Sequence, residues 1–137
     1  MGIIDYDKAT YSLALIDFDL FIESLNDLDK HMKDARENLY LIINKDDPEL
    51  VDYMETYALR KFKVAKRFFD TIRRDINKYT HKLKIFLSKN PKSKAVFDAK
   101  VKELTELMTE KETVIDNEIA LGEDYISRNK KHEDSVD

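Results

Sequence analysis

Apolar residues recur at alternating steps of three and four along most of this chain, which is the spacing of an amphipathic α-helix. The first series holds nine successive positions and predicts one long helix over residues 7–44. A stripe this regular is typical of coiled-coil-like packing, in which the apolar seam of one helix faces a neighbouring helix. The seam positions are Ala14, Phe18, Phe21, Leu25, Leu28, Met32, Ala35, Leu39 and Ile42.

Two prolines mark where further helices begin. Pro48 follows an Asp and Pro91 follows an Asn, and both pairs are favoured at a helix start because Asp and Asn cap the free N–H groups. They predict a second helix over residues 48–89 and a third over residues 91–128. Both connections between the helices are short, which favours antiparallel neighbours.

The sequence therefore predicts an all-α fold, namely an elongated antiparallel three-helix bundle with coiled-coil-like seams. Only two Gly and two Pro occur in 137 residues, so the chain offers few turns for a β-sandwich or a barrel. We expect a single helical-bundle domain over residues 1–128. Residues 129–137 contain one apolar residue and are expected to form a frayed or disordered polar tail.

The predicted seams are irregular at three positions. In the second helix the step of four from Ala58 to Phe62 follows another step of four, a stutter that predicts local unwinding of the supercoil. In the third helix Lys111 and Gly122 fall at inward positions. We expect Lys111 either to pair with an acid and fix the helix register, or to extend its ammonium group to the solvent.

The charges of the chain are strongly segregated, although the net charge is only −4. Residues 60–102 carry 15 Lys and Arg against 3 Asp and Glu, whereas residues 1–59 carry 5 against 14 and residues 103–137 carry 4 against 11. One interpretation is that opposite charges beside the seams of neighbouring helices match each other. The flanking residues are Lys61, Lys66, Arg73, Lys82 and Lys89 in the second helix and Asp17 and Asp29 in the first.

A second interpretation concerns the cations on the outward face of the second helix, which is the face away from its apolar seam, and at the turn after this helix. An outward basic stripe attracts phosphate groups or acidic proteins. It has no apolar side for lipid, so we expect no membrane binding. The candidate contacts for an anionic partner or nucleic acid are Lys63, Arg67, Arg74, Lys78, Lys84, Lys92 and Lys94.

The first predicted helix also carries a second apolar row. Leu13, Ile16 and Leu20 are spaced by three and four on the side away from Phe18. Because exposed apolar patches usually mark a contact with another chain, we expect this row to be a protein interface, with a partner or in a homo-oligomer. The alternative is that residues 3–6 fold back over the row.

The sequence lacks the residue patterns of common enzyme and metal sites. It has no Cys, and none of His31, His81 and His132 stands three residues after a Glu, as di-iron bundles require. There is no glycine-rich phosphate loop, and no pattern isolates a carboxylate in an apolar pocket for acid–base catalysis. We therefore expect no enzymatic activity, no cofactor, no metal and no small-molecule substrate.

These features favour a non-enzymatic helical interaction or assembly protein that self-associates or docks a protein partner. One alternative is a nucleic-acid-binding accessory protein that uses the basic second helix. Another is an acidic inhibitor that mimics nucleic acid with the first and third helices. No apolar run is long enough to span a bilayer, and we expect a cytoplasmic protein.

The start of the chain and its composition bear on the nucleic-acid alternative. Residues Ile4, Asp5, Lys8, Tyr11 and Ala14 resemble the opening of small phage recombination mediators, which would imply a role in recombination or replication. The resemblance covers about eleven residues and lacks the Tyr-Tyr-x-Gly turn, so no family is assigned on it. The Lys-, Asn- and Ile-rich composition suits a phage or an AT-rich bacterial genome.

Overall fold

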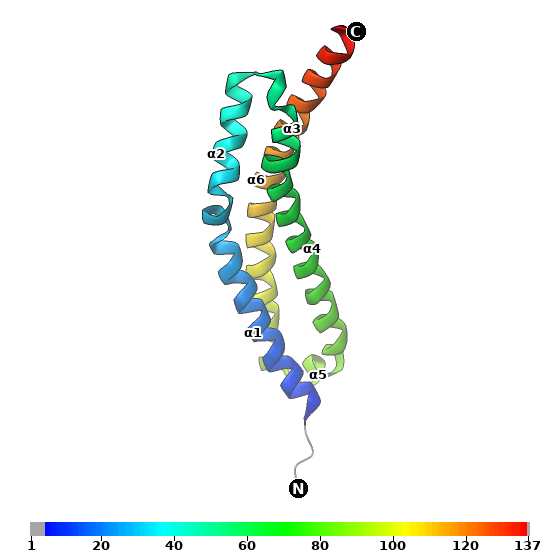
Figure 1. The fold of residues 1–137 in the computed structure, drawn as a ribbon. Coiled ribbons are helices and arrows are strands. Elements are labelled where there is room, and N and C mark those ends of the chain that lie inside the picture. Colours follow the sequence, from blue (N-terminus) through cyan, green and yellow to red (C-terminus); the bar gives the residue numbers. More distant parts are fainter. Residues whose placement is uncertain (1–4, 137) are drawn as a thin grey trace. The chain divides into compact units, whose positions relative to one another are not determined.

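The computed structural model describes the backbone of residues 5–136 and the side chains of residues 5–130. Within that range every regular element is a helix and no strand occurs, so the chain is all-α as predicted. The elements, drawn in Figure 1, are α1 (Tyr6–Asn26), α2 (Leu28–Lys45), η1 (Pro48–Leu50), α3 (Val51–Tyr53), η2 (Met54–Ala58), α4 (Leu59–Lys82), α5 (Lys84–Lys89) and α6 (Pro91–Val136).

The three predicted helices differ from the observed ones in their breaks and ends. The first is interrupted at Asp27, although the His31 N–H still donates to the Asp27 carbonyl over 3.2 Å. The Asp27 side chain makes no capping hydrogen bond at this break. The second is interrupted at Leu83, between α4 and α5.

Helix α6 continues to Val136, beyond the predicted end at residue 128. Asn129 is buried and its side-chain amide donates to the Tyr125 carbonyl over 2.8 Å. Lys130 pairs with Glu55 of η2 over 3.5 Å. These contacts extend the helix into the segment predicted as a polar tail, while the side chains of residues 131–137 lie outside the described residues.

The turn between α2 and η1 has the capping chemistry that the Asp-Pro pair predicts. Asp46 adopts a left-handed conformation with φ of 49°, and its N–H donates to the Ile42 carbonyl. The Asp47 side chain accepts a hydrogen bond from the Glu49 N–H over 2.9 Å, directly around Pro48. This turn ends α2 and starts the next helical segment within three residues.

Contacts divide the chain into two compact units. The first unit comprises the residues up to Asn26 together with Phe69–Thr109. The second comprises Asp27–Phe68 together with the residues from Glu110 onward. Helices α4 and α6 therefore each contribute one part to each unit.

The core of the first unit is built around Phe18 of α1, which is fully buried. Its ring meets Tyr79 of α4 edge-on at 5.8 Å between centroids and Phe97 of α6 at 5.5 Å. Aromatic rings favour this tilted geometry because the edge of one ring is positive and the face of the other is negative. One residue of each helix thus joins the three segments of this unit.

Polar contacts fix the helix directions in the first unit. Tyr11 of α1 donates its hydroxyl to the Ser93 carbonyl over 3.3 Å, and two turns further along both helices Asp19 pairs with Lys100 over 2.7 Å. Hence α1 and the first part of α6 run in the same direction. The segment formed by α4 and α5 runs opposite to α1, because Tyr79 of α4 donates to Asp17 whereas the later Phe86 of α5 contacts the earlier Tyr11.

In the second unit, α2 runs parallel to the second part of α6. Asp29 of α2 pairs with Lys111 over 2.8 Å, and two turns on Arg36 forms a two-armed ion pair with Glu118. Lys111 thus adopts the acid-paired arrangement, the first of the two predicted for it. Helix α4 runs antiparallel to α6, since Lys66 pairs with Asp116 and the preceding Lys63 pairs with Glu123.

The stutter in the predicted second seam coincides with a π-helix, η2. In this segment the Leu59 N–H donates to the Met54 carbonyl five residues earlier, so one extra residue is accommodated in the turn. As a result Ala58 and Leu59 are both buried. Leu59 packs directly against Gly122 of α6, where a larger residue would collide with it.

Candidate interaction surfaces

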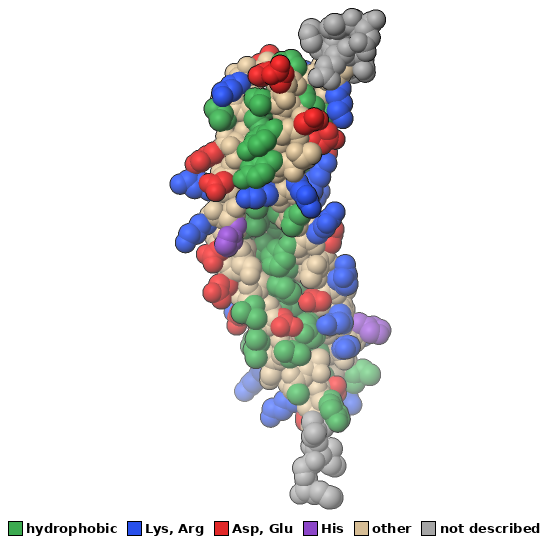
Figure 2. Space-filling view, in the orientation of Figure 1, with side chains coloured by type: hydrophobic (Ala, Val, Ile, Leu, Met, Phe, Trp, Pro, Cys, Tyr) green, Lys and Arg blue, Asp and Glu red, His purple; other side chains and the backbone are tan. Residues whose placement is uncertain are grey.

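The predicted apolar row lies exposed on α1. Leu13, Ile16 and Leu20 are 51%, 56% and 54% exposed, respectively. Ala14 and Phe18 on the opposite side of the helix are fully buried. The alternative is that residues 3–6 cover the row. Ile3 and Ile4 lie outside the described residues, and Tyr6 is exposed. Figure 2 shows such exposed hydrophobic side chains among charged ones on one face of the molecule.

Two polar contacts hold the orientation of α1 and thus of its row. Asp17 accepts the hydroxyl of the buried Tyr79, and Asp19 pairs with Lys100. Burial, together with the hydrogen bond and the charge of Asp17, raises the pKa of Tyr79 to about 12. The hydrogen bond to Asp19 likewise raises the pKa of Lys100. Both carboxylates are therefore engaged in the first unit and do not form a free acidic surface.

A free carboxylate follows the row by one turn. Glu23 lies three residues beyond Leu20, so it continues the spacing of Leu13, Ile16 and Leu20 on the same side of α1. It is exposed and has no ion pair within the described residues. We call these four positions the α1 row.

The predicted basic contacts are partly neutralised within the chain. In the first unit Lys78 lies 4.0 Å from Asp75, and Lys94 pairs with Asp98 over 2.6 Å. Three other cations of this unit have no ion pair in the part of the chain that is described. They are Arg74, Lys84 and Lys92.

The remaining two predicted contacts belong to the second unit. Lys63 is 3.5 Å from Glu123, and both side chains are about half exposed. Arg67 is exposed and also has an interaction partner. The seven predicted cations are thus distributed over both units, and three of them are without a carboxylate among the described residues.

Internal charge matching beside the seams occurs at some of the predicted positions. Lys66 reaches Asp116 of α6 over 2.7 Å, whereas Arg73 pairs with Asp70 within its own helix. Lys61 has neither kind of partner. Its ammonium group lies 5.4 Å from the centroid of the Tyr57 ring, a weak cation–π contact, and it has no ion pair within the described residues.

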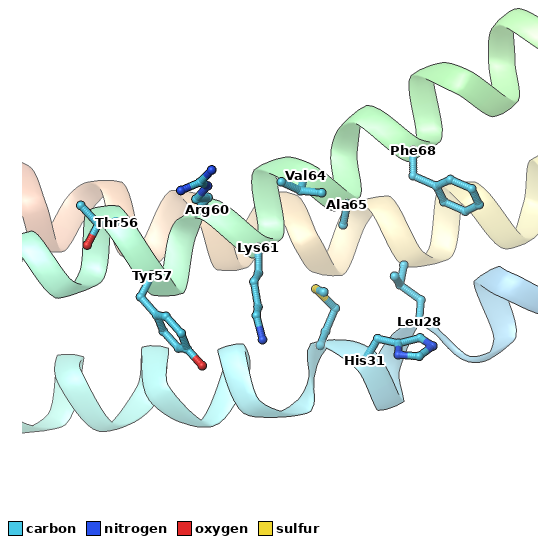
Figure 3. A pocket seen from close by; sticks show the side chains of 10 residues that line it. Leu28, His31, Thr56, Tyr57, Arg60, Lys61, Val64, Ala65 and Phe68 are labelled. Carbon is cyan, nitrogen blue, oxygen red and sulfur yellow. The ribbon is translucent and has the colours of Figure 1, made fainter.

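A groove in the second unit was not predicted from the sequence. It lies between α2 on one side and η2 with α4 on the other, and its volume is about 550 Å³ (Figure 3). Most of its walls are apolar, and Val64 is 52% exposed there. The lining residues are Leu28, His31, Met32, Thr56, Tyr57, Arg60, Lys61, Val64, Ala65 and Phe68.

The described lining of the groove contains basic residues and no acidic one. None of its ten described lining residues is Asp or Glu, whereas Lys61, Arg60 and His31 are basic. In Figure 3 the side chains of Tyr57 and Lys61 extend towards α2, and Arg60 points away from α2. Lys61 is half-buried, and its ammonium group has no ion pair among the described residues.

A spacing signal for the groove is present in the sequence. Tyr57, Lys61, Val64 and Phe68 follow one another at steps of four, three and four, which is a second helical row beside the seam. A lysine within such a series is typical of a solvent-exposed helix face. Only the structure shows that the row lies opposite α2.

No cluster of three or more metal-ligating side chains occurs among the described residues. Within the same residues, no helix is both long and apolar enough to cross a membrane. No family model, no curated protein and no solved structure matches this chain.

Proposed function

We propose that this chain is a non-enzymatic helical interaction or assembly protein, which self-associates or docks a protein partner through Leu13, Ile16 and Leu20. The observation that carries the proposal is their exposure of 51–56% on a helix whose other side is fully buried. Single exposed apolar residues are ordinary on protein surfaces, but a row of three at helical spacing is typical of a contact surface.

The size of the row limits what it contributes alone. Burying three half-exposed aliphatic side chains contributes roughly 1 kcal/mol each. Association costs about 4–15 kcal/mol in lost translational and rotational freedom. The surface that covers the row must therefore add apolar area and polar contacts of its own.

The predicted elongated antiparallel three-helix bundle is the arrangement that this proposal assumes. It is supported within each unit by the helix directions that the contact pairs define. In the first unit α1 runs with α6 and against α4, and in the second unit α4 runs against α6.

Sedimentation velocity tests the proposal directly. We expect the variant Leu13→Glu with Ile16→Glu to sediment as a smaller species than the wild type, or to lose a partner that the wild type retains. The matched control is Lys8→Glu, which changes the net charge equally at an exposed position outside the row of the same helix. If all three proteins have the same size and retain the same partners, the row is not an interface.

A second candidate function is nucleic-acid binding, favoured by the absence of ion pairs at Arg74, Lys84 and Lys92 within the described residues. If these cations contact phosphates, log affinity should fall by roughly 0.7–0.9 per contact for each unit of log salt. Lys92→Ser should weaken oligonucleotide binding more than Lys94→Ser, because Lys94 is already paired with Asp98. No binding at about 50 mM salt would exclude this function.

A further inference from the structure

We propose that the groove of the second unit binds the α1 row of a second copy of this chain. The contact is then between two different surfaces, the row of one copy and the groove of the other. This inference rests on the proposed function, because it names the partner of Leu13, Ile16 and Leu20.

The spacing of the two surfaces agrees. The α1 row extends over Leu13 to Glu23, and the helical row of the groove extends over Tyr57 to Phe68. At 1.5 Å per residue these lengths are about 15 Å and about 16 Å. A helix laid into a groove between two helices uses this kind of row, at steps of three and four, to make its contacts.

In one antiparallel register three consecutive positions of the two rows match, while Leu13 and Tyr57 lie outside the overlap. This register places Ile16 at Phe68, Leu20 at Val64 and Glu23 at Lys61. Val64 is 52% exposed, so it has apolar area left for a second chain to cover. The register pairs apolar with apolar side chains twice and then brings opposite charges together at the end.

The charges of the two surfaces are complementary. Lys61 extends towards α2 in the groove, none of the ten described lining residues is acidic, and the α1 row ends in a carboxylate. Neither Lys61 nor Glu23 has an ion pair within the described part of the chain. Covering the half-buried Lys61 by an apolar helix alone would leave its charge unpaired, so the occupant must supply an anion.

Mixing two variants tests the contact in the full-length protein. Ile16→Glu disables the row and Val64→Glu disables the groove, and both substitutions are at exposed positions where the fold tolerates a charge. Each variant alone should be monomeric by sedimentation, with a thermal unfolding midpoint close to that of the wild type. The mixture should form a one-to-one dimer, because the intact row of one variant enters the intact groove of the other.

A charge exchange tests the register. Lys61→Glu should raise the dissociation constant about tenfold, and Glu23→Lys should do the same. The double variant that carries both Lys61→Glu and Glu23→Lys in one chain should recover association, because every contact then brings the new carboxylate to the new ammonium group. Lys82→Glu is the matched control, since it makes the same charge change on α4 outside the groove and should leave association unchanged.

The outcomes separate this inference from the proposed function. If Val64→Glu associates like the wild type while Ile16→Glu does not, the row has another occupant and the groove assignment is wrong. If the wild type is monomeric but loses a captured protein on Ile16→Glu substitution, the second copy is wrong and a different partner uses the row. If Ile16→Glu changes neither property, both proposals are wrong.

Discussion

Gly122 of α6 lies directly beneath the side chain of Leu59. A Cβ atom at position 122 would lie 2.9 Å from Leu59 Cγ and closer still to Cδ2. Because Leu59 is fully buried, its side chain cannot move into solvent to avoid such an atom. The extra residue that η2 accommodates brings Leu59 to this position, and glycine is the residue that leaves room for it.

Gly122→Ala should therefore destabilise the protein, although alanine is the better helix former. Alanine gains about 1 kcal/mol in helix propensity, but overpacking a filled core costs about 1–3 kcal/mol. We expect a net loss of about 1 kcal/mol in the free energy of unfolding, measured by urea denaturation. In a Leu59→Ala background the same change should become stabilising, and an equal loss in both backgrounds would contradict the proposed contact.

The ion pair of Arg36 with Glu118 supports a second prediction. Glu118 is only 2% exposed, and Arg36 also lies 3.8 Å from Asp29. Burial lowers the pKa of the Arg36 guanidinium, but the hydrogen bond and charge of Glu118 outweigh it and raise that pKa above its ordinary value. Glu118 thus keeps the Arg36 guanidinium charged inside the second unit.

Arg36→Met should cost about 3 kcal/mol of unfolding free energy, because it leaves the Glu118 carboxylate buried without its guanidinium. Adding Glu118→Leu should restore stability to within about 1 kcal/mol of the wild type. Arg128→Met is the control, since the exposed Arg128–Asp124 pair should contribute less than about 0.5 kcal/mol. A double variant as unstable as Arg36→Met alone would show that the buried charge is not the cause.

Much of the helix packing is predictable from the sequence because it follows apolar spacing. Eight of the nine seam positions in the first predicted helix are buried, and the ninth, Phe21, is half-buried. The α2–η1 turn follows from Asp47 and Pro48, since capping is a local interaction. In these places residues that are close in sequence determine the structure.

The second half of α6 could not be predicted in this way. The sequence pattern places Ile119 and Ile126 inward, whereas the structure buries Glu118 and Tyr125 and leaves both isoleucines half-buried. The polar pair is inward because Arg36 balances Glu118 and the Asp47 carbonyl accepts the Tyr125 hydroxyl. Such partners are distant in sequence, so apolar periodicity does not reveal them.

The α1 row was predictable and the groove was not. Leu13, Ile16 and Leu20 form an excess of apolar residues on one helix, which is visible without a structure. The groove requires α2 and α4 to lie opposite each other, and Lys61 hides its apolar row. The absence of acidic residues from the described lining of the groove likewise depends on residues of both α2 and α4, and not on one segment.

The pKa of Tyr79 gives a third prediction, on pH dependence. The folded protein raises this pKa from 10.0 to about 12, so it stabilises the neutral phenol. The resulting stability is fully present below pH 10 and is lost as the pH rises towards 12. The unfolding free energy should fall over this interval, and the fall should be smaller in Tyr79→Phe.

Two variants test the causes of that pKa. Asp17→Asn should lower the pKa of Tyr79 towards its ordinary value, because the charge of Asp17 contributes to the shift, while burial keeps part of it. Ultraviolet absorbance measures phenolate formation as the pH rises. The titration of Tyr79 in the Asp17→Asn protein is the absorbance curve of Asp17→Asn minus that of Asp17→Asn with Tyr79→Phe. Burial also raises the pKa of Tyr125, so a residual pH dependence in Tyr79→Phe is expected. An unchanged Tyr79 titration in Asp17→Asn would contradict the hydrogen bond.

The left-handed conformation of Asp46 gives the fourth prediction. Its φ of 49° is the only positive value at a non-glycine position among the described residues, and a Cβ atom is sterically unfavourable there. Asp46→Gly removes that atom but increases the freedom of the unfolded chain, so we expect a net gain of about 0.5 kcal/mol in urea denaturation. Asp46→Asn should be nearly neutral because Asn tolerates this conformation, whereas Asp46→Val should lose about 1–2 kcal/mol. If Gly and Val have the same effect, the backbone conformation is not what constrains position 46.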